Sequence, residues 1–269
     1  MKYAQARELR CGPGNNRIVC CKAGTINAVC EEVMDLKGNH LTWLGHSTFR
    51  IETSEGKTVY LDPWVMGNPA CPESEKKVKK ADALICTHGH FDHIGDAVEI
   101  AKKHDSIVVG IFELCAWMEK KGVKHIAPMN KGGTQTVEGI NITMTQAVHS
   151  CGIQEDDGSI VYGGEACGYV LELPGGVKLY HGGDTAVFGD MQIIHDLYNP
   201  EIAMLPIGDH FVMSPREAAY ACNLLKPKIV IPMHFGTFPI LRGHPDHLKQ
   251  YLGKGGPEVV EMKPGQTLG

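Results

Sequence analysis

The sequence predicts an α+β domain built from two β-sheets with helices on their outer faces. Short runs of alternating or continuous apolar residues, which are typical of strands, occur in two separate groups along the chain. In each group, segments with helical periodicity follow the strands. Strands followed by helices, twice over, are the pattern expected when each sheet is covered by its own helices.

The first group lies between residues 41 and 121. Its strands, separated by turn residues such as Glu55 and Gly56, are expected at 41–44, 48–52, 58–61, 83–86 and 107–109. Helical periodicity covers 96–104, where Ala97, Ile100 and Ala101 lie on one side, and a second helix is expected over about 112–121. The residues between the fourth strand and the first helix therefore connect a strand to a helix.

The second group begins at Ile140. Its strands are expected at 140–148, 166–173, 177–181 and 229–231. Ser214 and Glu217 form a capping box with Pro215 at the first helical position, which predicts a helix from there through Leu225. Residues 150–164 are expected to form a surface loop, with a substrate lid as the alternative.

Composition narrows the class of protein. The 269 residues can bury a full hydrophobic core without disulfide bonds, and 43% hydrophobic with 21% charged residues is ordinary for a soluble enzyme. A net charge of −5 argues against nucleic acid or an anionic membrane as the partner. The chain has no 18-residue apolar run, its first ten residues are polar, and its ten cysteines fit a reducing compartment. We therefore expect a cytoplasmic protein.

The clearest chemical signal is the motif H-x-H-x-D-H, which directly follows the strand at 83–86. It places four potential metal ligands within six residues: His88, His90, Asp92 and His93. A turn at this point can direct the first two towards one centre and the last two towards another. Neutral imidazoles and a carboxylate suit zinc, iron or manganese. A polar loop that merely contains three histidines is the alternative, and the number and spacing of the ligand-type residues argue against it.

Three further ligand-type residues each follow an expected strand. They are His149, Asp184 and His234. A single histidine in such a position is usually a packed core residue. Loops that leave several strands can converge, however, and the order of these residues after the first motif favours one shared site.

The seven residues, in this order and at these intervals, resemble the signature of the metallo-β-lactamase fold. The resemblance covers residues 41–240 and is closest to the L-ascorbate-6-phosphate lactonase-like branch. It is also carried by the stretches WLGHS at 43–47, LDPW at 61–64, GNP at 67–69, IGDHF at 207–211 and PMHFGT at 232–237. It implies a four-layer αββα sandwich with a two-metal cleft at one edge, and a homo-oligomeric assembly.

Carried over position by position, the resemblance implies two divalent metal ions, with zinc or manganese favoured and iron or nickel also accommodated. The implied ligands of the first ion are His88, His90 and His149, those of the second are Asp92, His93 and His234, and Asp184 bridges them. Such a pair of ions lowers the pKa of a bridging water, and the resulting hydroxide attacks the substrate. Asp92 would both bind metal and orient the hydroxide.

Three other residues are candidates for supporting roles. Asp62 would fix the tautomer of a metal-binding histidine from outside the ligand set, and a turn-forming aspartate before proline is the alternative. His46 and His210 would line the cleft and act on the substrate or its leaving group, with a packed or surface histidine as the alternative for each.

The implied activity is hydrolysis of a small lactone, phosphoester or related ester. A redox enzyme of the diiron-flavoprotein type is one alternative, although such proteins usually have Glu where this chain has His90 and they need a flavin domain. A non-catalytic metal-binding module is the other, and the complete ligand set argues against it. Residues 40–269 would form the hydrolase domain.

Residues 1–39 are expected to be a cysteine-rich extension. Four cysteines occur there, at Cys11, Cys20, Cys21 and Cys30, and their spacing matches no compact metal-binding loop. Residues 1–33 are predicted to lie outside the catalytic core, as a lineage-specific segment or the product of an upstream start.

Overall fold

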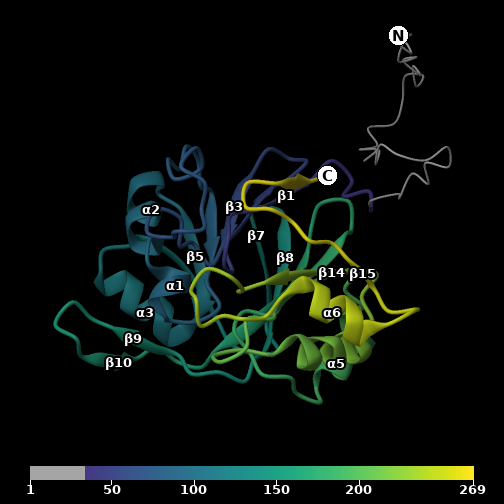
Figure 1. The fold of residues 1–269 in the computed structure, drawn as a ribbon. Coiled ribbons are helices and arrows are strands. Elements are labelled where there is room, and N and C mark those ends of the chain that lie inside the picture. The colour runs from purple at the N-terminus through teal and green to yellow at the C-terminus, as the bar shows by residue number, and fades with distance from the viewer. Residues whose placement is uncertain (1–33) are drawn as a thin grey trace, which may run out of the picture.

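The computed structural model describes residues 34–269, and these form two large sheets that pack face to face (Figure 1). The first sheet has the order β16-β1-β2-β3-β4-β5-β6. Its strands are β1 (His40–Trp43), β2 (Phe49–Glu52), β3 (Thr58–Leu61), β4 (Ala83–Ile85), β5 (Ile107–Ile111), β6 (His125–Met129) and β16 (Thr267–Leu268). Pairing is antiparallel from β16 to β3 and parallel from β3 to β6.

The second sheet repeats this mixture of pairings in the order β15-β14-β13-β12-β11-β8-β7. Its strands are β7 (Thr134–Val137), β8 (Ile140–Gln146), β11 (Cys167–Glu172), β12 (Lys178–His181), β13 (Ile202–Pro206), β14 (Ile229–Met233) and β15 (Glu258–Val259). Pairing is antiparallel from β7 to β12 and parallel from β12 to β15. A separate hairpin joins β9 (Gly152–Gln154) to β10 (Ile160–Tyr162).

Helices cover the outer face of each sheet. They are α1 (Phe91–Ile94), α2 (Ala97–His104), α3 (Phe112–Lys120), α4 (Met191–Tyr198), α5 (Pro215–Leu225) and α6 (Pro245–Leu252). Helix α2 contacts β4 and α3 contacts β5 and β6, whereas α5 contacts β13 and α6 contacts β15. Figure 1 shows α2 and α3 on one side of the sheets and α5 and α6 on the other. The expected α+β architecture of two sheets with outer helices is confirmed.

Strand β11 shows how the sequence separates the two sides of a sheet. Tyr169 and Leu171 belong to the apolar core between the sheets, whereas Val170 joins a second core that the sheet shares with its helices. Side chains alternate between the faces of a strand, so both faces of this sheet must be apolar. Strand β14 is accordingly buried along its whole length.

Most predicted elements coincide with observed ones to within two residues, and the capping box of Ser214 and Glu217 is present at the start of α5. The surface loop expected over 150–164 is different: it contains the hairpin β9–β10, and Ile153 on it is buried. The reason is packing, because Ile153 lies directly over the backbone of Gly89.

The segment before β1 belongs to the folded unit from the first described residues onward. Leu36 is part of the inter-sheet core, and the side-chain amide of buried Asn39 donates to the carbonyls of Leu36 and Pro174. Residues 1–33, with the four N-terminal cysteines, lie outside the described residues. No helix within 34–269 is long and apolar enough to cross a membrane.

Candidate metal centre

The H-x-H-x-D-H motif leaves β4 and turns at once into the short helix α1. The carbonyl of His90 accepts the backbone N–H groups of His93 and Ile94, each at 3.0 Å, so His90 starts the turn that carries Asp92 and His93. A side chain on Gly89 would come within 2.5 Å of Cγ1 of Ile153. Glycine between the first two histidines therefore lets the hairpin lie against the ligand loop.

The remaining ligand-type residues come from the second sheet and meet the motif at the same edge. Asp184 follows β12 after Gly183, where φ is +58° and a side chain would come within 2.8 Å of Thr87. His234 follows β14 with φ of +56°, and its N–H donates to the carbonyl of His46 at 3.0 Å. His149 follows β8. Left-handed backbone at the exits of β12 and β14, at Gly183 and His234, turns these two segments towards the shared edge.

The first ligand group contains three histidines. The candidate ligand atoms of His88, His90 and His149 all lie within 4.8 Å of one another. Nε2 of His88 is 3.0 Å from Nδ1 of His90, and the ring of His149 stands edge-on to both other rings, with centroids at 5.1 Å. Three imidazoles converging in this way are a common ligand set for a divalent metal.

A second group forms beside the first. It contains His46, Asp92, His93 and His234, again with ligand atoms within 4.8 Å of one another. Asp92, His93 and His234, the residues expected to bind a second ion, thus lie together, and His46 lies in the same group.

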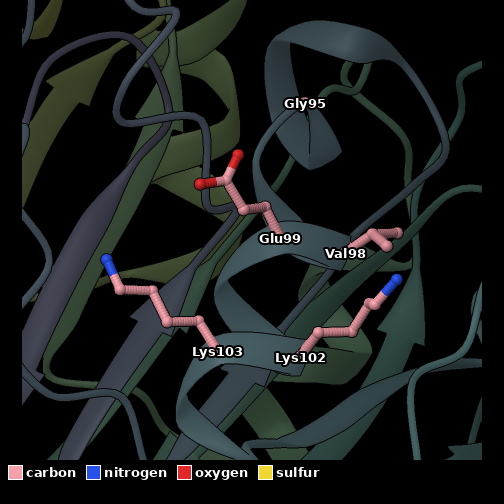
Figure 2. Close-up of a pocket in the computed structure, with 5 residues that line it drawn as sticks. All are labelled: Gly95, Val98, Glu99, Lys102 and Lys103. Atoms are coloured by element: carbon pink, nitrogen blue, oxygen red, sulfur yellow. The ribbon is translucent and has the colours of Figure 1, made fainter.

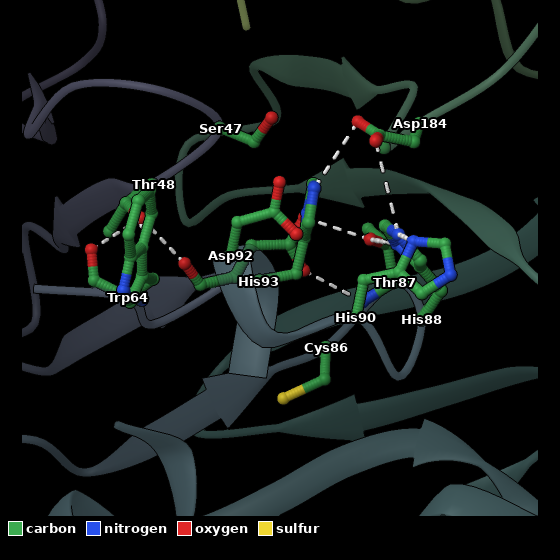
Figure 3. Close-up of polar contacts among 12 residues, drawn as sticks. Ser47, Thr48, Trp64, Cys86, Thr87, His88, His90, Asp92, His93 and Asp184 are labelled. Carbon is green, nitrogen blue, oxygen red and sulfur yellow. Dashed lines mark hydrogen bonds and ion pairs between the residues drawn. The ribbon is translucent and has the colours of Figure 1, made fainter. Parts of the chain in front are cut away.

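Asp184 lies between the two groups (Figure 3). Its Oδ1 is 3.3 Å from Nε2 of His93, and its Oδ2 is 3.0 Å from Nε2 of His234. The same Oδ2 is 3.6 Å from Nε2 of His149 and 3.9 Å from Nε2 of His88. One carboxylate therefore faces both groups, which is the placement expected of a bridging ligand.

Several of these atoms are buried without hydrogen bonds, which tests whether the site fits a metal. Nε2 of His93, Nε2 of His234 and Oδ1 of Asp184 have no hydrogen-bond partner among the described residues. Burying unpaired polar atoms is unfavourable by roughly 1–3 kcal/mol for each group. Cations coordinated by these atoms would remove that cost, so the donor set fits divalent metal.

The electrostatics of the centre also favour metal binding. Burial alone would raise the pKa of Asp184, but His234 and His93 outweigh burial and hold that pKa well below its ordinary value. Burial alone would lower the pKa of His93, but Asp184 and Asp62 outweigh it and raise that pKa. Burial lowers the pKa of the three imidazoles of the first group, His88, His90 and His149. Neutral imidazole and ionised carboxylate are the forms that bind metal, so Asp184 and the first group are already in that form, whereas His93 would lose a proton when a cation binds its Nε2.

Asp62 supports the centre from outside the ligand set. It is fully buried at the end of β3, and its Oδ2 is 2.7 Å from Nδ1 of His93. Its Oδ1 accepts the N–H of Thr87 and its Oδ2 accepts the hydroxyl of Thr87, both at 2.8 Å. This is the arrangement expected of a carboxylate that orients a metal-binding histidine. The sequence did not single out Thr87, although its position directly before His88 is a usable signal.

The two other histidine candidates differ in placement. His46 is fully buried, and its Nε2 is 3.0 Å from Oδ2 of Asp92. His210 is exposed on the loop after β13, where its ring packs edge-on against Phe211. Within residues 34–269 it belongs neither to the two groups described above nor to the third ligand-atom cluster, which is formed by His88, His93 and Asp184.

Only part of the centre is accessible. His88, His93, Asp184 and His234 are each at most 3% exposed. Asp92 and His149 have 16% and 15% of their side chains exposed, and His90 is partly exposed. A substrate would therefore approach over these last three residues.

A separate surface hollow lies along α2 (Figure 2). Its lining residues are Gly95, Val98, Glu99, Lys102 and Lys103. None of the metal-centre residues lines it, so this hollow is not part of the candidate site.

Comparison with known proteins shows the family of this chain. Residues 40–234 match the family model described as a β-lactamase superfamily domain. A UPF0173 metal-dependent hydrolase from Koribacter versatilis is 63% identical over 234 residues, covering 87% of this chain and 99% of the relative. One from Solibacter usitatus is 54% identical over 228 residues, covering 85% and 98%.

A solved structure shows the same fold. Igni18, a metallo hydrolase from the archaeon Ignicoccus hospitalis, is 35% identical and superimposes with a TM-score of 0.75, covering 86% of this chain and 97% of Igni18. With the family model matched over most of the chain and relatives matched over nearly their whole length, this chain belongs to the UPF0173 metal-dependent hydrolase family of the metallo-β-lactamase fold.

Proposed function

We propose that this protein is a dinuclear hydrolase that cleaves a small lactone, phosphoester or related ester. The observation that carries the proposal is the position of Asp184, whose carboxylate faces ligand groups on both sides. One carboxylate that faces two groups supports two ions better than one.

Each residue has a defined part in this proposal. The first ion would be held by His88, His90 and His149, the second by Asp92, His93 and His234, and both by Asp184. When bound, the ions supply an acidified water and stabilise negative charge that develops on the substrate. Asp92 is more exposed than the other carboxylate of the centre, so it is placed to orient the attacking water towards the substrate.

The residues next to the accessible ligands favour a substrate with an apolar part. Phe91, between two ligands of the motif, is 59% exposed, and Val148, directly before His149, is 47% exposed. Exposed apolar side chains next to accessible ligands in the sequence suit the hydrocarbon part of a lactone or carboxylic ester. A lactonase related to the ascorbate-6-phosphate branch is thus within the proposed class.

His210 is the proposed proton donor to the leaving group. Its loop is held between two ligand-bearing loops, because the N–H of Met213 donates to the carbonyl of Thr185 and Gly208 lies against the carbonyl of His234. The loop that carries His210 thus contacts two loops that carry ligands, and its imidazole is exposed, as a group that meets substrate would be.

The test uses the full chain, stripped by a chelator and reloaded with zinc or manganese. We expect the reloaded protein to hydrolyse a γ-lactone or an aryl ester, and His88→Ala to abolish the activity. His247→Ala, at an exposed histidine of α6, is the matched control and should leave the rate unchanged.

Two results would contradict the proposal. One is the binding of two ions with no turnover of any lactone, carboxylic ester or phosphodiester, which would indicate a metal-binding module. The other is oxygen turnover by an iron-loaded protein with a visible charge-transfer band, which would indicate redox chemistry.

A further inference from the structure

His46 stands at the centre of a buried contact chain that reaches the metal centre. It lies in the turn after β1, is fully buried, and has φ of +56°. Its Nδ1 is 3.0 Å from Oγ1 of Thr237, and its Nε2 is 3.0 Å from Oδ2 of Asp92. Both ring nitrogens therefore contact side chains of other segments, helix α1 and the loop after β14.

The backbone around this ring is held as firmly as the ring itself. The carbonyl of His46 accepts Nε1–H of Trp43 and the N–H of His234, each at 3.0 Å. Gly45 lies so close to Ala70 that a side chain on it would approach to 2.8 Å. The ring cannot shift without moving the loop that carries His234.

Aromatic side chains enclose the ring. Trp64 stands edge-on to it with centroids at 5.3 Å, and Phe238 does so at 5.9 Å. The His234 ring lies at 3.9 Å. Enclosure of this kind keeps water from the ring itself, whereas its partners Asp92 and Thr237 are partly exposed.

The direction of the hydrogen bonds follows from the groups involved. A carboxylate only accepts, so Nε2 of His46 carries the proton that it donates to Asp92. A neutral ring then has an acceptor at Nδ1, which takes the hydroxyl hydrogen of Thr237. The chain of donors runs from Thr237 through His46 to Asp92, and it leaves Oδ1 of Asp92 available.

We infer that His46 is a positioning residue that fixes Asp92 for the second ion, and that Thr237 fixes the tautomer of His46. This rests on the proposed dinuclear function. The role assigned here differs from a direct ligand, because Nε2 is used by Asp92, and from a group acting on the substrate, because the ring has no exposed surface.

Cobalt(II) titration of the stripped full chain tests the inference. The wild type should bind two ions. His46→Phe keeps an aromatic ring and loses both nitrogens. It should weaken the binding of one of the two ions by about 10- to 100-fold, the usual effect of removing a partner outside the ligand set. His46→Gln, which restores an N–H donor, should recover most of that loss.

Thr237 provides a milder pair of variants. Thr237→Val should weaken the binding of the same ion, whereas Thr237→Ser should not. Thr143→Val is the control, since the Thr143 hydroxyl pairs with that of Thr134 away from the site. This pair keeps the test decisive if His46→Phe fails to fold. The cobalt d–d spectrum at saturation should keep its shape in every variant, because no ligand is lost.

Contrary outcomes are distinguishable. Unchanged cobalt affinity in folded His46→Phe and Thr237→Val would overturn the positioning role of His46. An altered cobalt spectrum at saturation would also overturn it, because His46 would then be a ligand. Failure of the wild type to bind two ions would instead overturn the dinuclear proposal on which the positioning role of His46 rests.

Discussion

Asp62 accepts a hydrogen bond from Nδ1 of His93 at 2.7 Å, and this contact decides which nitrogen of His93 faces the metal centre. Because the carboxylate cannot donate, Nδ1 carries the proton and Nε2 is left with its lone pair, 3.3 Å from Oδ1 of Asp184. A strand end of the first sheet thereby sets the chemistry of a ligand on α1.

Replacing Asp62 should therefore weaken metal binding without removing a ligand. For Asp62→Ala we expect a loss of about 10- to 100-fold in zinc affinity, because His93 is no longer held in one tautomer. Competition with a chelating dye measures it. Asp82→Ala is the control, since that carboxylate accepts the N–H of Thr58 and pairs with Lys80. Equal affinity in Asp62→Ala and the wild type would refute the supporting role.

The contact between the hairpin and the ligand loop predicts a rescue. Gly89→Ala places a methyl group against Cγ1 of Ile153 and should lower the free energy of unfolding by about 1–3 kcal/mol, the usual range for overpacking. Ile153→Ala in the same chain opens the space and should make the glycine substitution nearly neutral. Additive losses in the double variant, measured by urea unfolding, would show that the two residues do not compete for space.

Helix α5 offers a prediction about stability alone. The side chain of Ser214 accepts the N–H of Glu217, and the Glu217 side chain accepts the N–H of Ser214. Ser214→Ala should lower the free energy of unfolding by about 1 kcal/mol and leave metal content unchanged. Chemical denaturation and elemental analysis of the same samples check both halves. A loss of metal would mean that this helix start affects the centre.

Buried thiols predict a pH dependence. Burial raises the pKa of Cys71, Cys115 and Cys222 from 9.0 to about 12, and that of Cys151 to about 11. Unfolded chains ionise these thiols near pH 9 and the folded chain does not. The free energy of unfolding therefore has its full value below pH 9 and falls as the pH rises towards the pKa values of the thiols in the folded chain.

Urea unfolding below and above pH 9 measures this loss of stability, and alkylation mapped by mass spectrometry tests the burial that causes it. At pH 8 the four cysteines should resist iodoacetamide in the native protein and react in denaturant, because the thiolate is the reactive form. Native labelling of Cys151 as fast as in denaturant would contradict its burial, in which its Sγ accepts the N–H of Gly89 at 3.3 Å.

The sequence predicted strands and helices well where periodicity and caps were strong. The strand at 58–61 and the helix from Pro215 to Leu225 have the bounds that the pattern indicates. Helix α6 was missed, although Pro245 starts it and the His244 ring accepts the N–H of Asp246. Histidine is an uncommon cap, so the local signal was weak.

Long-range contacts were the limit. Residue spacing within the motif indicated a metal site, but it does not show that Thr237 lies against His46, 191 residues away, because sheet packing creates that contact. The sequence likewise predicts a loop where the hairpin containing Ile153 forms, because the burial of Ile153 depends on its contact with Gly89. Roles that depend on such contacts become visible only in the folded chain.

The metal-to-protein ratio, measured by elemental analysis, decides whether the centre holds two ions. After stripping and reloading with zinc or manganese, the wild type should hold two tightly bound ions per chain. His149→Ala and His234→Ala should each retain one bound ion, because each removes a ligand from a different group. A wild-type chain that saturates at a single ion would show that the centre is not dinuclear.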